Sequence, residues 1–308
     1  MGNHEERTEL KLGDDGYPSC VAELQGPPGC LYVRGNAAAL GEPALSIVGS
    51  RHATPYGLAL AEMAGRVAAQ SGVTVVSGGA VGCDQAAGRA ALDAGGRHVI
   101  VLGTGADVVY PPSARGLMER TLEAGGAVVS IEPWGTGPRP WAFPKRNRVI
   151  AALSKALFVT EAGMPSGTFS TAETAFALGR EVFAAPGSIL SPQSRGSNDL
   201  IANGACCIVD TEALETAISR VYGVLRFVRP EAPGLQGLDG CERRIIEMLV
   251  ASPMRAEDVA GALRIGGMDC SCLLGGLEAE GIVERLLDGR WAPAKRALHA
   301  LTPLGDNG

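Results

Sequence analysis

Short continuous runs of apolar residues recur along the middle of this chain, and most lead into longer amphipathic stretches rich in Ala. The apolar runs lie at Ala44–Val48, Val73–Val76, His98–Leu102, Ala127–Ser130, Ala156–Val159, Glu181–Ala184 and Cys206–Val209. Strands covered on both faces show continuous rather than alternating apolar residues. Helical spacing follows at Pro55–Ser71, Asp84–Ala94 and Ser170–Gly179. This alternation predicts an α/β fold with a doubly wound, mostly parallel sheet and right-handed crossovers.

The composition divides the chain into two domains. The stretch RPEAPGLQGLDG has the character of a linker. Three helical patterns and two short apolar segments follow it, which is typical of a small winged-helix-like domain. We expect a disordered leader at 1–16, a main domain at 17–228, the linker at 229–240, the winged-helix-like domain at 241–293 and a disordered tail at 294–308. In the main domain, Cys30–Arg34 is expected as an edge strand or an entry arm.

The charge balance argues against a protein that coats duplex DNA by bulk charge, but it leaves room for a local basic groove. The 308 residues carry a net charge of −6, and 46% of them are hydrophobic. The eight Cys form no C-x-x-C pair and there are only four His, so we expect free thiols, no metal site and no cofactor. The sequence shows neither a signal-peptide core nor an apolar run long enough to span a membrane, which predicts a cytoplasmic protein.

Three glycine-containing loops each follow a predicted strand and precede a helix. In parallel sheets such loops meet at the carboxyl edge, where helix N-termini and open backbone favour anions. The candidates in these loops are Gly49, Ser50, Arg51, Gly78, Gly79, Ser166 and Gly167. Arg51 can clamp a phosphate at two points. The alternative is that the loops are ordinary turns and caps, with Asp84 as the cap of the second helix.

The segment Pro138–Arg148 interleaves cations and aromatic residues and contains no acidic residue. Such a mixture suits single-stranded nucleic acid, whose unpaired bases stack while its phosphates pair with cations. We expect a loop stiffened by its prolines. The candidate contacts here are Phe143, Lys145, Arg146, Asn147 and Arg148. Trp141 is at least as well explained as a core residue, and the cations could instead form a solvated rim.

The residues that covalent catalysis needs are not recognisable in this chain, so we do not expect an enzyme. There is no G-x-S-x-G elbow, and neither His52 nor His98 belongs to a recognisable triad. A carboxylate pair of Asp84 with Glu132 or Glu161 is conceivable, but the sequence cannot bring these residues together.

At these motifs the chain resembles the DNA-processing protein A family, also called DprA or Smf. The resemblance covers Tyr17 to Asp210 and, more weakly, the chain up to Pro293. The motifs are Ile47–Arg51, Ser77–Asp84, Leu102–Gly105, Tyr110–Pro112, Phe143–Arg148 with Ile150-Ala151, Glu161-Ala162, Ser166–Thr168, Gly179–Phe183, Ala185–Gly187, Gly196–Asn198 and Asn203–Ala205.

The resemblance implies an extended Rossmann-like domain that binds single-stranded DNA, forms a homodimer, protects incoming DNA and loads the RecA recombinase in natural transformation. Carried onto matching positions, Arg51 and Lys145 would contact phosphates, helped by Gly49 and Ser50. Phe143 would stack on a base, and Ser166 and Gly167 would line the same pocket.

The chain departs from the family pattern in the second glycine loop. The family usually has Arg where Val81 stands, Ile where Cys83 stands and His where Gly88 stands. We do not expect the N-terminal helical domain of many members, because only 16 residues precede Tyr17 in this sequence. The acidic winged-helix-like domain is better suited to a protein partner than to phosphates.

Two other functions stay open. One is a nucleoside-monophosphate-cleaving enzyme of the lysine-decarboxylase-like group, which carries a Pro-Gly-Gly-x-Gly-Thr loop followed by Glu. The nearest string here, Met164–Thr168, lacks the Gly pair, although Glu173 follows it. The other is a protein scaffold in which the basic segment is only solvated.

Overall fold

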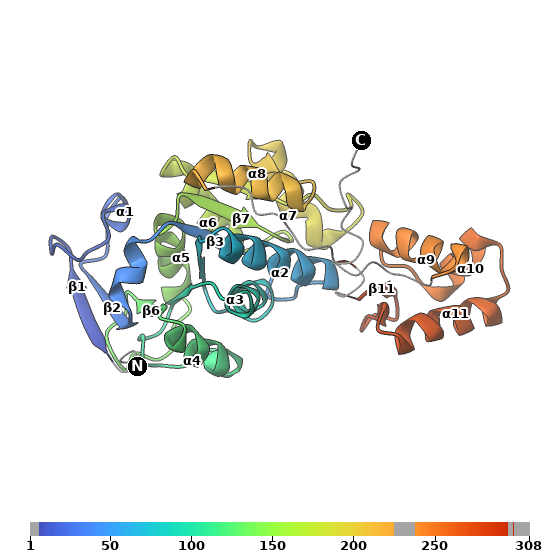
Figure 1. Ribbon diagram of the computed structural model, residues 1–308, viewed down its shortest axis with the longest axis horizontal. Coiled ribbons are helices and arrows are strands. Elements are labelled where there is room, and N and C mark those ends of the chain that lie inside the picture. Colours follow the sequence, from blue (N-terminus) through green and yellow to red (C-terminus); the bar gives the residue numbers. More distant parts are fainter. Residues whose placement is uncertain (1–5, 225–237, 295–297, 299–308) are drawn as a thin grey trace.

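The computed structural model describes residues 6–224, 238–294 and 298. A nine-stranded sheet in the order β1-β2-β6-β5-β4-β3-β7-β8-β9 dominates it (Figure 1). The strands are β1 (Arg7–Lys11), β2 (Cys30–Gly35), β3 (Ala44–Val48), β4 (Thr74–Ser77), β5 (His98–Leu102), β6 (Ala127–Ser130), β7 (Ala156–Val159), β8 (Glu181–Ala184) and β9 (Cys206–Cys207). The pairs β1·β2 and β2·β6 are antiparallel and all other neighbours are parallel. The prediction of a mostly parallel α/β sheet is confirmed.

Helices cover both faces of the sheet. They are α1 (Ser19–Ala22), α2 (Pro55–Gln70), α3 (Cys83–Asp93), α4 (Arg115–Glu123), α5 (Ala142–Ala152), α6 (Thr168–Ala177), α7 (Arg195–Ala202) and α8 (Thr211–Tyr222), with short 3-10 turns η1 (Ala37–Gly41), η2 (Pro112–Ala114) and η3 (Pro192–Ser194). Alternate residues of β5 show the two layers. Ile100 packs with α4, whereas Val101 belongs to the core on the side of α5. Helices α2, α3 and α8 share the face of α4, and α1, α6 and α7 share that of α5.

The prediction of a disordered leader at 1–16 is wrong for residues 6–16, which the structure describes. β1 pairs antiparallel with β2, with Leu10 opposite Leu31, and both side chains are buried. Charged residues occupy most of this edge strand, and its one apolar residue, Leu10, is also its one buried residue. Such a short pattern does not stand out from a polar leader. Cys30–Arg34 forms β2, which lies inside the sheet between β1 and β6 rather than at its edge.

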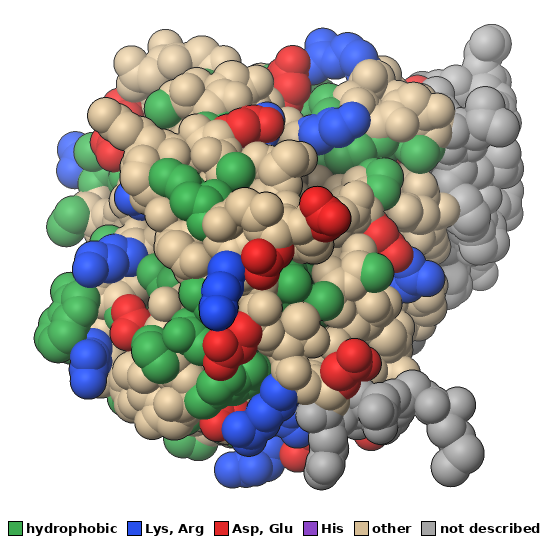
Figure 2. Space-filling view, turned by 90° about the vertical axis from the view of Figure 1, so that its left-hand side faces the viewer, with side chains coloured by type: hydrophobic (Ala, Val, Ile, Leu, Met, Phe, Trp, Pro, Cys, Tyr) green, Lys and Arg blue, Asp and Glu red, His purple; other side chains and the backbone are tan. Residues whose placement is uncertain are grey.

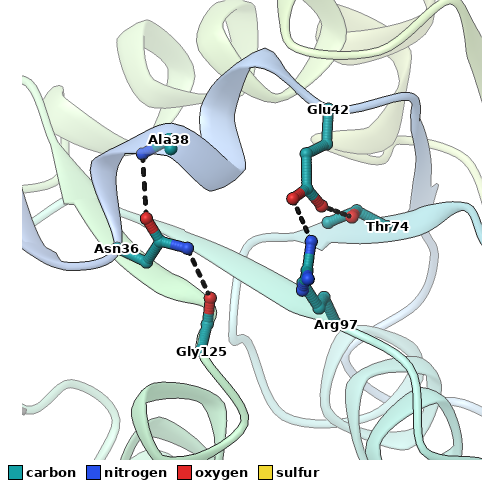
Figure 3. A network of polar contacts seen from close by, with 6 residues as sticks. All are labelled: Asn36, Ala38, Glu42, Thr74, Arg97 and Gly125. Atoms are coloured by element: carbon teal, nitrogen blue, oxygen red, sulfur yellow. Dashed lines mark hydrogen bonds and ion pairs between the residues drawn. The ribbon is translucent and has the colours of Figure 1, made fainter. Parts of the chain in front are cut away.

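The segment that leads into β3 is fastened by side chains that contact β4 and the residues just before β5 and β6 (Figure 3). Asn36 Oδ1 accepts the Ala38 N–H at 3.1 Å, and its amide donates to the Gly125 carbonyl at 3.1 Å. The Glu42 carboxylate accepts from Thr74 Oγ1 at 3.0 Å and pairs with Arg97. These contacts fix the start of β3, the inner strand from which the site described below extends.

The C-terminal residues form a separate packing unit at one end of the molecule (Figure 1). It consists of α9 (Gly240–Ala251), α10 (Ala256–Leu263), α11 (Gly267–Ala279), β10 (Val283–Arg285) and β11 (Trp291–Pro293), the last two antiparallel. Its own apolar core includes Ile245, Val259 and Leu274. The elements follow the predicted order, and the winged-helix assignment stays a prediction. Most of the linker 229–240 and the tail 294–308 lie outside the described residues.

His98 of β5 is a buried, neutral histidine. Its Nε2 lies 2.9 Å from Ser77 Oγ and its Nδ1 lies 2.9 Å from Thr121 Oγ1. Burial lowers the pKa of His98 from 6.5 to about 3. The imidazole therefore joins β5 to β4 and α4 in its uncharged form.

This histidine should make the protein less stable in mild acid. The unfolded chain takes up a proton on His98 near pH 6.5, whereas the folded protein does so only near pH 3. The contribution of the neutral imidazole to the free energy of unfolding is therefore fully present above pH 6.5 and falls below it. Between pH 7.5 and pH 5 the loss is about 2 kcal/mol. Urea unfolding at the two pH values measures this loss. In His98→Gln, the free energy of unfolding should fall by about 2 kcal/mol less than it does in wild type. Equal drops in the two proteins would show that His98 titrates normally when folded.

Candidate nucleic-acid interface

The predicted glycine loops meet where the strand order changes direction. From β3, the chain adds β4, β5 and β6 on one side, whereas β7, β8 and β9 lie on the other. An open α/β sheet binds ligands outside the carboxyl ends of its strands at such a switch point. The loops after β3, β4, β5 and β7 and the start of α5 gather at this edge, as the following contacts show.

The loop Gly49-Ser50-Arg51 after β3 is held by close backbone contacts. The Ser50 N–H donates to the Glu161 carbonyl at 2.8 Å, which joins this loop to the one after β7. A Cβ on Gly49 would lie 2.7 Å from Cys83 Sγ, so only glycine fits. Gly82 has φ +89°, and a Cβ there would lie 3.0 Å from the Arg51 carbonyl oxygen. The loops after β3, β4 and β7 are thus packed tightly together.

Arg51, Phe143 and Tyr110 form a cluster of one cation and two rings. Arg51 is exposed, and its Cζ lies 5.7 Å from the centroid of the half-buried Phe143 ring. The Tyr110 ring lies 5.6 Å from that of Phe143 and is tilted by 42°. Phe143 also rests on Gly103, where a Cβ would lie 2.8 Å from its Cδ1. The structure therefore brings together the loop after β3, the loops after β5 and the start of α5.

The basic segment is a helix over most of its length, not the loop that we expected. α5 begins at Ala142, and Pro144 occupies its first turn, where the missing N–H breaks no helical hydrogen bond. Val149 and Ile150 lie on the inner face of the helix and are buried. The helix turns successive side chains to different sides, so the cations of the segment have different surroundings.

Lys145 is exposed and follows Phe143 by two residues on the first turn of α5. Asn147 is half-buried, and its amide donates to the Gly167 carbonyl and to Ser170 Oγ, both at 3.3 Å. It thereby ties α5 to the loop that contains Ser166 and Gly167. Arg148 is half-buried and donates to the Gln25 carbonyl.

Three of the predicted contact residues, Arg146, Gly78 and Gly79, are buried, so the prediction that they contact nucleic acid is corrected here. Arg146 is 4% exposed and donates to the carbonyls of Gly78 and Val101. The N–H of Gly78 is already taken by Asp84 Oδ2, at 3.0 Å, and cannot cradle a phosphate. These residues hold the loop after β4 in place.

Asp84 is not the helix cap that its position suggested. It lies inside α3, whose N-cap is Gly82, and its Oδ2 also accepts the Ala80 N–H at 3.4 Å. Asp84 Oδ2 and Arg146 Cζ would lie 2.6 and 2.7 Å from a Cβ on Gly78, so the two groups face each other across that glycine. Burial lowers the pKa of Arg146 to about 10, and burial raises the pKa of Asp84 against the opposing effect of Arg146.

The other buried carboxylate of the site, Glu161, is also engaged. It accepts from the Thr54 N–H at 2.8 Å and from Thr54 Oγ1 at 2.6 Å, while Thr54 caps α2. Burial raises the pKa of Glu161. Asp84 and Glu161 thus each bind backbone N–H groups of loops. Glu173, the residue on which a nucleotide-cleaving site would depend, lies exposed on α6.

A groove of about 900 Å³ opens beside the Arg51 loop, between α2 and α3. Its lining includes Arg51 and Gly82 as well as Arg89 and Asp93 of α3. Because it carries both signs of charge, it lacks the uniformly positive lining of a phosphate track. Figure 2 shows a similar mixture at the β1 end of the molecule, where Lys and Arg alternate with Asp and Glu.

Sequence reasoning missed two members of the site and misjudged a neighbour. Tyr110 and Gly103 both belong to motifs of the family resemblance, which was the available signal, but nothing local placed them beside Phe143. Trp141 is 55% exposed, so its interpretation as a core residue is wrong.

None of the described helices is long and apolar enough to cross a membrane.

Fold and site together define an α/β protein with a cation–aromatic cluster at its sheet switch point. A family model described as DNA recombination-mediator protein A matches residues 9–219. The chain therefore belongs to the DNA recombination-mediator protein A family, as its motifs predicted. It is 40% identical to protein Smf of Escherichia coli over 198 residues, which are 64% of this chain and 53% of that protein. The chain thus spans about half the length of that relative.

Two solved structures are similar to about two thirds or more of this chain. DNA processing protein A from Streptococcus pneumoniae has a TM-score of 0.63 and 36% identity, covering 68% of this chain and 74% of its own. DNA processing protein A from Helicobacter pylori, studied for its single-stranded DNA binding mode, has a TM-score of 0.63 and 27% identity, covering 72% of this chain and 100% of its own.

One of the departures from the family pattern has a packing reason, and a second is a buried residue. Gly88 lies against His98, and a Cβ there would come 2.5 Å from His98 Cε1, so the buried histidine of β5 excludes a side chain at this position. Cys83 is buried beneath Gly49, and burial raises the pKa of its thiol to about 12. The third, Val81, is 50% exposed, and no contact of the described residues explains it.

Proposed function

We propose that this chain binds single-stranded DNA at the carboxyl edge of its sheet. The observation that carries the proposal is the exposed Arg51 guanidinium, 5.7 Å from the Phe143 ring, with exposed Lys145 on the same helical turn as Phe143. An aromatic ring flanked by cations stacks an unpaired base and pairs with the phosphates on either side. We propose that Gly49, Ser50, Ser166 and Gly167 line this site. Asn147 ties α5 to the loop of Ser166 and Gly167, and Arg148 holds α5 against the Gln25 carbonyl.

The comparisons support this ligand. The chain belongs to a family of recombination mediators, and a relative with the same fold was solved for its single-stranded DNA binding mode. We extend the proposal to the whole protein: it acts in the cytoplasm as a homodimer, protects incoming single strands and loads RecA during natural transformation. A net charge of −6 argues against binding duplex DNA by bulk charge.

The proposed activity is binding without covalent chemistry. The two buried carboxylates at the site, Asp84 and Glu161, hold loops through backbone N–H groups. Neither is placed to attack a substrate. The alternative, a nucleoside-monophosphate-cleaving enzyme, is tested by incubating the protein with nucleoside monophosphates. Release of free base would contradict the proposal of binding alone.

The C-terminal unit is proposed to contact protein. Its helix α11 contains no Lys or Arg, and it exposes Asp269 and Glu278. A helix that enters the DNA groove needs cations for the phosphates, and α11 offers none.

Phe143→Ala tests the stacking role. Loss of one stacked ring should weaken the binding of a single-stranded oligonucleotide by about 1–3 kcal/mol, and Phe143→Tyr should keep most of the affinity. Fluorescence anisotropy with a labelled oligonucleotide measures both variants. A folded Phe143→Ala protein with unchanged affinity would contradict the role of this ring.

A further inference from the structure

Trp141 and Arg139 stand in front of α5, outside the site described above. Trp141 is the N-cap residue of α5 and is 55% exposed. Arg139 Cζ lies 5.5 Å from the centroid of its ring, within the range of a cation–π contact. Arg139 is also exposed, and no acidic residue occurs between Pro138 and Arg148. The pair therefore presents an aromatic plane and a positive charge to solvent.

Packing does not account for this tryptophan. The apolar contacts that bury α5 come from Ala142, Val149, Ile150, Ala151 and Ala152, all at most 1% exposed. The indole makes no cap hydrogen bond to the helix. An open indole ring with a guanidinium beside it is an arrangement on which an unpaired base can stack.

Phe143 and Trp141 differ in what surrounds them. Phe143 is half-buried against Gly103 and Tyr110, so it offers one protected ring to a base. Trp141 lies two residues earlier, and more than half of its surface is open. The same segment therefore offers a second ring two residues before Phe143 and a second guanidinium four residues before it.

We infer that Trp141 and Arg139 form a second stacking platform for single-stranded nucleic acid, outside the Phe143 subsite. This inference rests on the proposed function. One base covers the open surface of the indole, and Arg139 contacts the ring and an adjacent phosphate. The cation beside the ring and the lack of carboxylates favour a polyanion with bases over an acidic protein segment, which would gain nothing from stacking.

The test combines binding and intrinsic fluorescence. A base that stacks on an indole quenches its emission, so saturating oligothymidylate should quench wild type more than Trp141→Phe, which lacks this fluorophore. An oligonucleotide of the same length with abasic sites should bind through its phosphates and leave the emission of Trp141 unchanged. Equal quenching by the abasic strand would overturn stacking at this ring.

Affinity gives an independent readout. Trp141→Ala should bind the oligonucleotide about tenfold more weakly, and Trp141→Phe should keep most of the affinity. The matched control is Phe176→Ala, which removes another exposed aromatic residue, 39% exposed and on α6. If wild type binds and quenches no more than Trp141→Phe, and Trp141→Ala binds as tightly, the platform is overturned while the proposed function stands. If folded wild type does not bind at all, the platform and the proposed function both fail.

Discussion

Asp84→Ala is expected to lower the free energy of unfolding by about 3–5 kcal/mol, because it leaves the buried Arg146 cation without its opposing charge. The same change removes the acceptor of two N–H groups, those of Gly78 and Ala80. Arg146 is 4% exposed, so water cannot replace the lost carboxylate. Urea unfolding at pH 7.5 measures the effect.

Asp93→Ala is the matched control, because Asp93 lies on the same helix but pairs with Arg120 at the surface, with 65% of its side chain exposed. Its loss should cost under about 1 kcal/mol. Combining Asp84→Ala with Arg146→Met should cost less than the sum of the single changes, since no charge is then left buried. A cost for Asp84→Ala no larger than that of Asp93→Ala would contradict the described role of this pair.

The double variant Arg51→Ala/Lys145→Ala should bind single-stranded DNA roughly 10- to 100-fold more weakly at low salt. Each phosphate contact on a single strand contributes about 0.7 to the slope of log affinity against log salt, so the slope should fall by about 1.4. Both side chains are exposed, so the loss should occur without a loss of stability. Anisotropy titrations at several salt concentrations give the affinity and the slope together.

A charge-matched control separates local contacts from net charge. Lys155→Ala/Arg220→Ala also removes two exposed cations, one just before β7 at the opposite edge of the sheet and one on α8. Its affinity and salt slope should stay close to those of wild type. Equal losses in the two double variants would mean that the cations act through overall charge and that the site is misplaced.

Much of the fold could be predicted from the sequence because buried parallel strands leave an unmistakable pattern. The continuous runs Ala44–Val48 and His98–Leu102 are strands with the same bounds in the structure. β1 could not be found in this way, because an edge strand with one buried side chain resembles a polar leader. The start of α5 was hidden by its prolines, which suit a first helical turn as well as a loop.

The candidate site was predictable as a set of loops but not residue by residue. The sequence offers Lys145 and Arg146 as equivalent neighbours, yet the helix turns one to solvent and buries the other behind Phe143. Gly78 and Gly79 have the character of an anion cradle, and the anion that fills it is the carboxylate of Asp84. Only tertiary structure decides whether a protein group or a ligand satisfies such a loop.

A direct competition between single-stranded and duplex DNA tests the central claim. A labelled single strand bound to the wild-type protein is challenged, at low and at moderate salt, with the unlabelled strand and with a duplex of the same sequence. We predict that the single strand displaces the label at a much lower concentration than the duplex and that its affinity falls as salt rises. Equal displacement by the duplex, or no binding to a folded protein at low salt, would contradict the account.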